Sequence, residues 1–540
     1  MPDSTLSELN LLKKMSNQKP EYFSHEEFIN RTQKLRDIEA LGINPYPPKF
    51  DPTAFAADLH KEYDQSELIK DSESAMKGEG PNANLAGRLV LFRAMGKNAF
   101  AHIQDGSGRI QIMFNRDLSV IEGLPEGENG LKFVEKKIDL GDIIGVEGTL
   151  FRTQKGELTL FVKKMVLLTK TLLPLPDKHA GLADKELRYR KRWLDLITNE
   201  EVKNRFVERS KILNIIRDFL HAEKFIEVET PVLQSIYGGA EARPFTTVLN
   251  ALDQDMFLRI SLEIPLKKLI VGGMERVFEM GKVFRNEGID RNHNPEFTLL
   301  EAYASYWDYN DMMRLMETLF EKIALAIYNK TTVPYTNPET GETIEIEMKA
   351  PWKRMTMKDA VKIYGKLDPD TLSDEEMRKI LLDSGHVDPK KLNVLSRGLL
   401  IAALFEVFSE PHLIQPHHII DHPIETTPLC KPHRDQKSRE EGLVERFETF
   451  ILGQEMANSY TELNHPEIQR MLLEKQADRR EAGDEEASPL DEEFLEAICQ
   501  GMPPTGGIGM GVDRLIMLFT NSHSIRDVLY FPWMKPEKSE

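Results

Sequence analysis

The stretch RVFEMGKVFRNEGIDRNHNPEFTLLEAY, residues 276–303, predicts an antiparallel hairpin. Apolar and polar residues alternate in RVFEMGKVFRNEG and again in PEFTLLEAY, and the polar loop IDRNHN separates these segments. Ionisable side chains are too dense along this hairpin for an ordinary core. If the hairpin is considered alone, surface salt bridges are the alternative interpretation. The candidate functional residues on it are Arg285, Glu287, His293, Phe297, Glu301 and Tyr303.

Two further stretches lie on either side of the hairpin in the sequence. Upstream, the helical pattern KILNIIRDFLHAEK leads into FIEVETPVL at residues 225–233, where Pro231 cannot donate a hydrogen bond to a sheet. Downstream, PPTGGIGMGVDRLIMLF at residues 503–519 joins a glycine-rich strand to an apolar helix, with Arg514 near the junction. Such a junction directs an arginine and helix N-terminal amides toward an anion or an aromatic ring. Each stretch alone is a weak signal.

A different pattern precedes these stretches. Between residues 85 and 168, short alternating segments are separated by glycines, and five strands in this length predict a small Greek-key barrel of the oligonucleotide-binding (OB) kind. Residues 1–75 are typical of charged helical material with a proline-rich end. The basic segment LRYRKRWLDL at residues 187–196 fits a helix packed between domains and a contact with RNA about equally well.

Size and composition describe a multidomain globular protein. The 540 residues predict two or three domains, and 40% hydrophobic with 29% charged residues is usual for a folded soluble chain. The longest apolar run, LLIAALF at residues 399–405, is far shorter than the roughly 18 residues of a membrane-spanning helix. Two cysteines without CxxC spacing support neither a disulfide framework nor a cysteine zinc site. The N-terminal residues lack a secretory or transit pattern, so the chain is expected in the cytoplasm.

The charge balance limits the kinds of partner. A formal net charge of −18 argues against nonspecific binding to nucleic-acid phosphates over the whole surface, and no DNA partner is expected. The sequence contains neither a GxGxxG dinucleotide fingerprint nor a GxxxxGK[ST] P-loop. Phosphate binding therefore depends on another arrangement.

In this order and spacing, the three stretches resemble motifs 1, 2 and 3 of the class II aminoacyl-tRNA synthetases. The preceding barrel resembles the anticodon-binding domain of the subgroup that charges aspartate, asparagine and lysine. Within this subgroup the chain is similar to the bacterial type of lysyl-tRNA synthetase from about residue 85 to residue 534. The segments that carry this similarity are GGAEARPF at residues 238–245, FRNEG, HNPEFT, FTNSHSIRDV, and FP at residues 531–532.

The resemblance implies an α+β multidomain fold, with an N-terminal OB-fold β-barrel followed by a class II synthetase catalytic domain, an antiparallel sheet flanked by helices. The expected division is a helical extension at 1–75, an OB-fold anticodon-binding domain at 76–170, a linker at 171–197 and a catalytic domain at 198–540. The implied activity is that of a lysine–tRNA ligase. Such an enzyme activates L-lysine with ATP to lysyl-adenylate and pyrophosphate, and then transfers lysine to the 3′ end of tRNA(Lys).

Adenylate formation gives the residues of the ATP site their expected roles. The substrate carboxylate attacks the α-phosphate in line, so the enzyme needs charge neutralisation and positioning more than a base. Arg285 is the candidate that bridges the lysine carboxylate and the α-phosphate. By the family pattern, Glu287 and His293 hold the nucleotide and Phe297 stacks on one adenine face. Arg514 covers the other face and reaches the γ-phosphate, so Arg285 and Arg514 are the expected catalytic residues.

Selection of lysine requires an acidic pocket, because a buried ammonium group needs carboxylates and other acceptors around it. The family positions that receive the side-chain ammonium fall on Glu301, Glu462 and Tyr303. Those for the α-amino group fall on Glu263 and the backbone of Gly239. Acidic or neutral residues at the aligned positions favour lysine over aspartate.

Three further positions complete the predicted lysine site. Asn458 corresponds to the family residue on the carboxylate side, Tyr460 to the wall against the aliphatic stem, and Arg285 also reaches the carboxylate. The chain departs from the family in LEIPLK, around Glu263, because the family usually has a proline before the glutamate and an aromatic residue two positions after it. The shape of this wall is therefore expected to differ.

Magnesium binds oxygen ligands. Glu448 and Glu455, in RFETFILGQEMANSYTELN, resemble the metal-binding pair of the family, so Mg²⁺ is the expected cofactor with ATP as a substrate. A separation of seven residues fits both two helical turns and an odd number of strand steps, and the spacing leaves the backbone conformation open. Solvated carboxylates are the alternative if the segment is considered alone.

In the barrel, Phe100 and Gln111 match family positions that stack on and hydrogen-bond to anticodon uridines. A family arginine expected five residues after the GR dipeptide at 87–88 falls on Phe92, with Arg93 next to it. Either Arg93 substitutes through a shift in register or this contact is absent. Aromatic residues of barrels also serve as ordinary core residues, which is the alternative for Phe100.

The expected partners are tRNA(Lys), ATP, L-lysine and a second copy of the chain, with no membrane. Motif 1 forms the dimer interface of the family, so a homodimer with Pro231 near the partner is expected. The rival interpretation is a noncatalytic nucleic-acid-binding relative with the same fold, or a lysyl-transferase paralogue, which lacks the barrel. A noncatalytic relative is expected to lose its arginines or its metal-binding pair, whereas this chain keeps Arg285, Arg514, Glu448 and Glu455.

Overall fold

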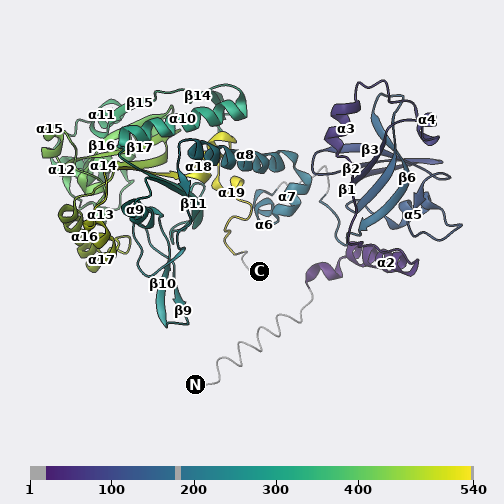
Figure 1. Cartoon of the computed structure of the whole chain (residues 1–540), viewed down its shortest axis with the longest axis horizontal. Coiled ribbons are helices and arrows are strands. Elements are labelled where there is room, and N and C mark those ends of the chain that lie inside the picture. The colour runs from purple at the N-terminus through teal and green to yellow at the C-terminus, as the bar shows by residue number, and fades with distance from the viewer. Residues whose placement is uncertain (1–19, 177–183, 394, 537–540) are drawn as a thin grey trace, which may run out of the picture. The chain divides into compact units, whose positions relative to one another are not determined.

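The structure is a computed structural model of the chain, and it describes residues 20–176, 184–393 and 395–536. The chain divides into two compact units, Met1–Gly181 and Leu182–Glu540 (Figure 1). Residues 1–19 of the predicted N-terminal extension and residues 177–183 of the predicted linker lie outside the described residues. Each unit contains a hydrophobic core of its own.

The N-terminal unit is a closed β-barrel. β1 pairs with β2 and β5, β2 with β3, and β5 with β6, all antiparallel, and a parallel pairing of β3 with β6 closes the barrel. Along β2, Ala99, Ala101 and Ile103 are buried in the core, while Phe100 and His102 alternate with them on the outer side. The predicted OB fold is confirmed. The elements of this unit are η1 Glu21–Ser24, α2 Glu26–Ala40, α3 Ala56–Tyr63, α4 Ser72–Met76, β1 Asn82–Met95, β2 Asn98–Gln104, β3 Arg109–Asn115, β4 Val120–Ile121, α5 Gly130–Lys137, β5 Ile143–Arg152 and β6 Leu158–Thr169.

The C-terminal unit is built on an eight-stranded sheet. Its strand order is β15-β16-β17-β18-β19-β12-β11-β7, and every neighbouring pair is antiparallel except the two at the edges, β15–β16 and β11–β7. The predicted α+β fold with a mainly antiparallel sheet is confirmed. The strands are β7 Ile226–Glu227, β11 Arg276–Phe284, β12 Glu296–Ser305, β15 Lys353–Thr356, β16 His417–Pro423, β17 Leu443–Ile451, β18 Gln454–Thr461 and β19 Thr505–Gly511.

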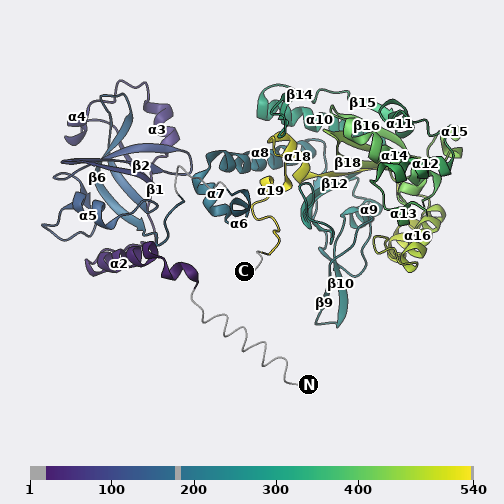
Figure 2. The same ribbon diagram turned by 180° about the vertical axis from the view of Figure 1, so that it is seen from behind.

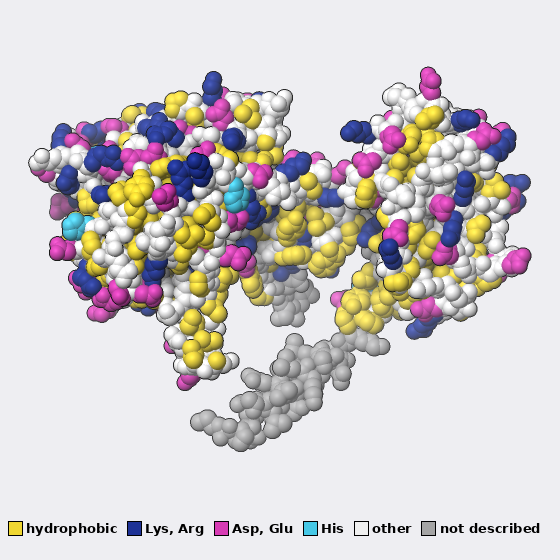
Figure 3. All heavy atoms as spheres, in the orientation of Figure 1, with side chains coloured by type: hydrophobic (Ala, Val, Ile, Leu, Met, Phe, Trp, Pro, Cys, Tyr) yellow, Lys and Arg dark blue, Asp and Glu magenta, His cyan; other side chains and the backbone are white. Residues whose placement is uncertain are grey.

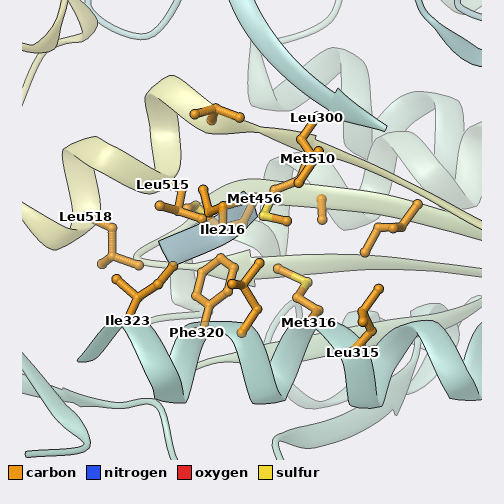
Figure 4. Packing of buried hydrophobic residues seen from close by; sticks show 14 of the residues in the cluster. Ile216, Leu300, Leu315, Met316, Phe320, Ile323, Met456, Met510, Leu515 and Leu518 are labelled. Carbon is orange, nitrogen blue, oxygen red and sulfur yellow. The ribbon is translucent and has the colours of Figure 1, made fainter. Parts of the chain in front are cut away.

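Helices cover one face of this sheet and form a large hydrophobic core with it. Ile216, Phe320 and Leu515 come from three different helices and join Leu300 and Met510 of the central strands in one buried cluster (Figure 4). Burial of these apolar faces holds the central strands in place. The three helices are α8 Glu200–Ala222, α10 Tyr309–Tyr328 and α18 Val512–Phe519.

The opposite face of the sheet carries polar groups at its centre. Because side chains alternate along β12, Leu300 and Ala302 face the helical core, while Glu301 and Tyr303 project from the other face. α9 packs against β11 and β12, α17 packs against α9, and α16 packs against α17. Figure 2 shows α9 beside β12. The polar face is thereby walled by helices, which are α9 Glu263–Val271, α16 Pro466–Glu481 and α17 Glu492–Cys499.

A separate three-stranded sheet, in the order β8-β10-β9, extends from the C-terminal unit. Val248 and Leu252 in its β9–β10 hairpin are 51% and 67% exposed, and Figure 3 shows hydrophobic side chains at the tip of this hairpin. Exposed apolar side chains gathered in one place are typical of an interaction surface. The strands are β8 Leu233–Gln234, β9 Thr246–Leu249 and β10 Gln254–Leu258.

A helical insertion between β15 and β16 has a hydrophobic core of its own. Among the described helices, none is long and apolar enough to cross a membrane. The elements not yet placed are α6 Lys185–Arg190, α7 Arg192–Thr198, β13 Thr332–Thr336, β14 Thr343–Glu347, α11 Met357–Ile363, α12 Asp374–Ser384, α13 Pro389–Leu392, α14 Arg397–Phe408, η2 Glu410–His412, η3 Ile424–Thr426, α15 Gln436–Glu440 and α19 Ile525–Val528.

The basic segment at residues 187–196 forms parts of α6 and α7. Arg192 is 1% exposed, pairs with Asp195 and donates a hydrogen bond to the carbonyl of Tyr530. Trp193, next to it, is exposed. The buried side of the segment therefore packs against the C-terminal part of its own unit, and the choice between packing between domains and a contact with RNA stays open.

Candidate active site

A cavity of about 500 Å³ lies on the polar face of the central strands. Its walls come from β12, β18, β19, α9 and the loop between β11 and β12. Glu448 lines an adjoining cavity of about 440 Å³ instead, together with Glu455 and Arg514. The predicted residues that line the first cavity are Gly239, Glu263, Arg285, Glu287, His293, Phe297, Glu301, Tyr303, Glu455, Asn458, Tyr460, Glu462 and Arg514.

Two glycines leave room at the inner end of this cavity. A Cβ on Gly507 would lie 2.0 Å from Oε1 of Glu462 and 2.5 Å from the ring of Tyr303. Gly239 has a φ of +83°, and a Cβ there would lie 2.8 Å from the hydroxyl of Ser261. Neither position accepts a side chain without displacing a group of the pocket.

Three buried carboxylates and one buried lysine form the inner end. Glu263, Glu301 and Glu462 are 5%, 4% and 1% exposed. The Nζ of Lys267, on α9, lies 2.5 Å from Oε1 of Glu263 and also forms an ion pair with Oε2 of Glu462. Oε1 of Glu462 has no hydrogen-bond partner in the described part of the chain. A buried acceptor without a hydrogen-bond partner destabilises the folded protein unless a ligand donates to it.

Glu301 accepts three hydrogen bonds. The donors are the Ser261 hydroxyl at 2.8 Å, the Leu262 backbone N–H at 2.9 Å and the Tyr303 hydroxyl at 2.9 Å. Leu262 stands where the family usually has a proline, which has no N–H to donate. The departure in LEIPLK therefore gives Glu301 an extra donor, and Pro265 lies in the first turn of α9, where proline is tolerated.

Burial controls the protonation of the carboxylates in the pocket. Removal from water raises the pKa of Glu301 to about 7, and the charge of Glu263 adds to this shift. Burial also raises the pKa of Glu462 to about 8, although the ion pair with Lys267 opposes the shift. Near neutral pH both groups therefore retain protons for a substantial fraction of the time.

Strand register orders the pocket from its outer to its inner end. Glu301 of β12 lies level with Asn458 of β18, and Tyr303 lies level with Tyr460. Phe297 lies at the start of β12, on the outer side of both levels. Glu301 is therefore at the level of the predicted carboxylate contact, and Tyr303 is nearer the inner end.

Arg446 organises the carboxylate side of the pocket and was not among the predicted site residues. Its Nε donates to Oδ1 of Asn458 at 3.0 Å, its guanidinium lies 5.7 Å from the centre of the Tyr460 ring, and it forms an ion pair with Glu448. Asn458 in turn donates to the Tyr460 hydroxyl at 2.7 Å. The available sequence signal was its place two residues before Glu448, since alternate residues of a strand share a face.

The predicted nucleotide-binding residues lie on the loop between β11 and β12. The strands end at Phe284 and resume at Glu296, so this loop is longer than the six residues that the sequence predicted. The N–H of Asn286 donates to the carbonyl of Arg243, which draws the chain out of the strand ladder. The residues placed on the loop rather than in a strand are Arg285, Glu287 and His293.

Charged and aromatic groups line the outer end of the cavity. The guanidinium of Arg285 lies 5.3 Å from the centre of the Phe297 ring. Arg514 donates to the backbone carbonyl of Glu455 at 2.6 Å and lies 3.3 Å from Nε2 of His293. Two arginines and an aromatic ring thus border one space, a combination that suits a purine triphosphate.

Glu448 and Glu455 lie on the paired strands β17 and β18 with a turn between them, so their seven-residue spacing reflects neither helical turns nor steps along a single strand. Burial, followed by the charge of Glu448, raises the pKa of Glu455. Two unpredicted carboxylates, Glu406 and Glu410, line the same cavity, and burial raises the pKa of Glu410 to about 7. Within the described ranges no three His, Cys, Asp or Glu side chains form a metal site. A pair of carboxylates still fits a Mg²⁺ ion that also binds phosphates.

Comparison with known proteins identifies the family. Residues 184–535 match the tRNA synthetases class II (D, K and N), and residues 83–168 match the OB-fold nucleic acid binding domain. The chain belongs to the class II tRNA synthetases. The resemblance inferred from the three motifs and the barrel is confirmed. Members of this family are ATP-dependent ligases, so the predicted enzyme class is confirmed as well.

Relatives of this class II synthetase align over nearly its whole length. A lysine–tRNA ligase of Chlamydia felis is 55% identical over 97% of the chain and 99% of its own length. One of Chlamydia caviae is 54% identical over 96% of the chain and 99% of its own length. One of Thermoanaerobacter pseudethanolicus is 45% identical over 97% of the chain and 100% of its own length.

In the OB-fold part of the synthetase, a β-bulge sets the position of a basic residue. The register of β1 on β2 shifts between Leu89 and Leu91, and beyond this bulge Arg93 stands opposite Phe100. Directly opposed residues share a face, so Arg93 lies on the outer face with Phe100, while Phe92 packs against the barrel core. This position leaves Arg93 available on the same face as Phe100, and its contact with the anticodon stays a prediction.

The other two predicted anticodon residues are partly engaged within the OB-fold part of the synthetase. Phe100 is half-buried and packs with Met113 and Phe161 in a small apolar cluster. Gln111 is 9% exposed, and its Nε2 donates to the Thr159 hydroxyl at 2.8 Å. Each therefore presents only part of its surface to a ligand.

Proposed function

We propose that the protein is a lysine–tRNA ligase. It activates L-lysine with ATP to lysyl-adenylate and pyrophosphate, and then transfers lysine to the 3′ end of tRNA(Lys). The observation that carries the proposal is the buried pocket of Glu263, Glu301 and Glu462, in which one oxygen of Glu462 lacks a partner among the described residues. A cationic side chain satisfies such an acceptor, whereas aspartate or asparagine leaves the carboxylates unbalanced. The bacterial relatives named lysine–tRNA ligase support the same assignment.

Adenylate formation is assigned to charge neutralisation by two arginines. A carboxylate oxygen of lysine forms a bond to the α-phosphorus while the bond from that phosphorus to the pyrophosphate oxygen breaks, and the electron pair leaves with pyrophosphate. Arg285 neutralises the reacting carboxylate and α-phosphate, and Arg514 binds the outer phosphates. Glu287 and His293 hold the nucleotide. Phe297 stacks on the adenine.

The lysine substrate is proposed to lie along the pocket from its outer to its inner end. Arg285 and Asn458 bind the carboxylate, and Tyr460 packs against the aliphatic stem. The order of levels along β12 and β18 supports this direction. The residues assigned to the two amino groups are Gly239, Glu263, Glu301, Tyr303 and Glu462.

Glu448 and Glu455 would hold Mg²⁺, which when bound supplies positive charge to the phosphates of ATP. Arg446 fixes Glu448 by an ion pair. Arg514 donates to the backbone carbonyl of Glu455, and its guanidinium lies 3.7 Å from Oε2 of the same residue, which keeps that carboxylate beside the outer end. The two side chains supply only oxygen ligands, which is the donor type that Mg²⁺ prefers.

The OB-fold domain would bind the anticodon of tRNA(Lys) through Arg93, Phe100 and Gln111 on its outer face. Aromatic stacking and hydrogen bonds to base edges are the usual means of reading single-stranded RNA. In the transfer step, the 3′-terminal ribose hydroxyl attacks the adenylate carbonyl, and the departing phosphate of AMP accepts the proton. This role in translation goes with a cytoplasmic location.

We also propose a homodimer formed through the β8–β10 sheet and the segment before it, with Pro231 near the partner. Apolar side chains on this part of the unit are between 36% and 67% exposed. Burial of such a patch is the usual driving force of a permanent dimer. The residues concerned are Val232, Leu233, Val248, Leu249 and Leu252.

Amino-acid-dependent exchange between ATP and pyrophosphate tests the proposed function. The full-length protein is assayed with Mg²⁺ against each of the twenty amino acids, and exchange with lysine alone is the expected result. Exchange with aspartate or asparagine would overturn the lysine assignment and keep the family. Failure with every amino acid would favour the noncatalytic interpretation.

A further inference from the structure

Lys267 is a cation built into the pocket that the proposed function assigns to a cationic substrate. It is 0% exposed and pairs with Glu263 on one side and Glu462 on the other. A separation of four residues on α9 places Lys267 and Glu263 on the same helix face. The next residue, Lys268, instead pairs with Glu493 near the surface. Only the first of the two adjacent lysines contacts carboxylates that line the cavity.

We propose that Lys267 is a resident counter-ion that matches the pocket to a substrate with two ammonium groups. This inference rests on the proposed function. Glu263, Glu301 and Glu462 supply three carboxylates, and Lys267 supplies one ammonium group. Lysine brings an α-ammonium and an ε-ammonium group, and Arg285 neutralises its carboxylate. In the complex, three carboxylates are therefore balanced by three ammonium groups.

Lys267 also determines how Glu462 faces the substrate. Its ion pair engages Oε2 of Glu462 and leaves Oε1 beside Gly507 without a partner among the described residues. Without the lysine, Glu263 and Glu462 would repel each other, and one of them would turn away or take up a proton. Lys267 thus acts through two carboxylates rather than on the substrate, which makes it a positioning residue.

The other nearby cation does not change this balance. Arg446 approaches the pocket from β17, but its guanidinium is paired with Glu448 and hydrogen-bonded to Asn458, on the carboxylate side. Although burial opposes its charge, the carboxylates of Glu263 and Glu462 raise the pKa of Lys267, so this lysine stays protonated. Within the described ranges, Lys267 is therefore the cation that forms ion pairs with the inner carboxylates.

Two backgrounds in which the charge balance differs provide the test. In the wild-type background, Lys267→Met is expected to raise the KM for lysine in the exchange assay by about tenfold or more, with the KM for ATP within about twofold. In a Glu263→Gln background, the complex with lysine has two carboxylates and three ammonium groups, one of them from Lys267. Adding Lys267→Met removes this excess positive charge, so it is expected to lower the KM for lysine. Lys268→Met is the matched control, with both KM values expected within about twofold of wild type.

The direction of the effect separates charge balance from a general structural role. A rise in the KM for lysine in both backgrounds, or no change in the wild-type background, would overturn the inference. If Lys267→Met alone does not fold, the double variant carries neither member of the buried pair and is expected to bind lysine more tightly than Glu263→Gln. Weaker or equal binding by the double variant would overturn the inference as well.

The proposed function is checked separately on the wild-type protein. If the wild-type protein shows no exchange with lysine, the proposed function fails, and the inference about Lys267 fails with it. If the wild-type protein exchanges with lysine but Lys267→Met acts in the same direction in both backgrounds, only the inference fails.

Discussion

Gly507 lies so close to Glu462 that a Cβ on the glycine would come within 2.0 Å of the carboxylate oxygen Oε1. A Cβ on Gly509, two residues further along β19, would meet nothing closer than 3.7 Å. The two glycines lie on one strand and project toward one face. The two glycines can therefore be compared directly, and only Gly507 limits the space beside the carboxylate of Glu462.

Gly507→Ala is expected to raise the KM for lysine by at least about tenfold, because the new methyl group displaces Glu462. The KM for ATP should stay within about twofold, since the nucleotide binds at the other end of the cavity. Gly509→Ala is the control and should change the KM for lysine by less than about threefold. Equal effects of the two substitutions would attribute the result to strand flexibility instead.

The affinity for lysine is expected to rise between about pH 6 and pH 8. Burial raises the pKa of Glu301 to about 7 and that of Glu462 to about 8 in the free protein. A bound ammonium group favours the charged carboxylate and lowers both pKa values, so binding releases protons. Below the pKa of the free protein, affinity should fall by up to about tenfold per pH unit for each proton released.

Isothermal titration calorimetry in two buffers with different ionisation enthalpies measures this release. Glu263 and Tyr303 line the same cavity, Lys267 pairs with Glu263 and Glu462, and all three influence the pKa values of the two titrating carboxylates. Glu301→Gln is expected to reduce the number of protons released at pH 7, because one titrating group is lost. Equal binding enthalpies in the two buffers would contradict the expected protonation of the free pocket.

Arg285→Ala is expected to lower kcat of the exchange reaction by about a hundredfold to a thousandfold, because the guanidinium neutralises charge at the reacting atoms. The control is Lys282→Ala, on β11, which removes an exposed cation that pairs only weakly with Glu296, at 3.7 Å. Pre-steady-state measurement of adenylate formation gives the rate of the chemical step directly. An increase in KM with an unchanged kcat would be inconsistent with a role in the transition state.

Arg93→Ala and Phe100→Ala are each expected to raise the KM for tRNA in aminoacylation and to leave lysine-dependent exchange unchanged, since exchange requires no tRNA. Loss of one stacking contact corresponds to roughly a fivefold to hundredfold weaker interaction. Lys132→Ala, on α5, removes an exposed positive charge from another part of the barrel and serves as the control. If Lys132→Ala weakens tRNA binding as much as Arg93→Ala, general electrostatic attraction would explain the effect.

Local patterns in the sequence predicted the hairpin and the barrel, whereas the resemblance to the class II synthetases supplied most of the predicted pocket residues. Alternation in β11 and β12 marked the hairpin, and residues of the hairpin and of the glycine-rich stretch at 503–519 line one cavity, to which the stretch at 225–233 contributes no residue. Lys267 was not among the predicted site residues; two adjacent lysines follow Glu263 in the sequence, and the packing of α9 buries only the first of them. The predicted domain boundaries and the roles of the individual residues stay predictions.

The sequence did not predict contacts between segments that lie far apart along the chain. Glu406 and Glu410 lie in the helical insertion, and no local pattern links them to Glu448 and Glu455 on β17 and β18. The bulge in β1 that places Arg93 opposite Phe100 depends on the pairing with β2, which composition does not encode. Such features are determined by tertiary packing rather than by local propensity.

The pairing of β12 with β19 has a consequence for the synthesis of the protein. β12 ends at Ser305, and its neighbour β19 begins only at Thr505, close to the end of the chain. During translation one edge of β12, with the apolar residues Leu300 and Ala302, remains without its final partner until residues 505–511 have been made. Completion of the central sheet therefore depends on a contact between segments far apart along the chain, and this step is expected to follow the formation of the local β11–β12 hairpin.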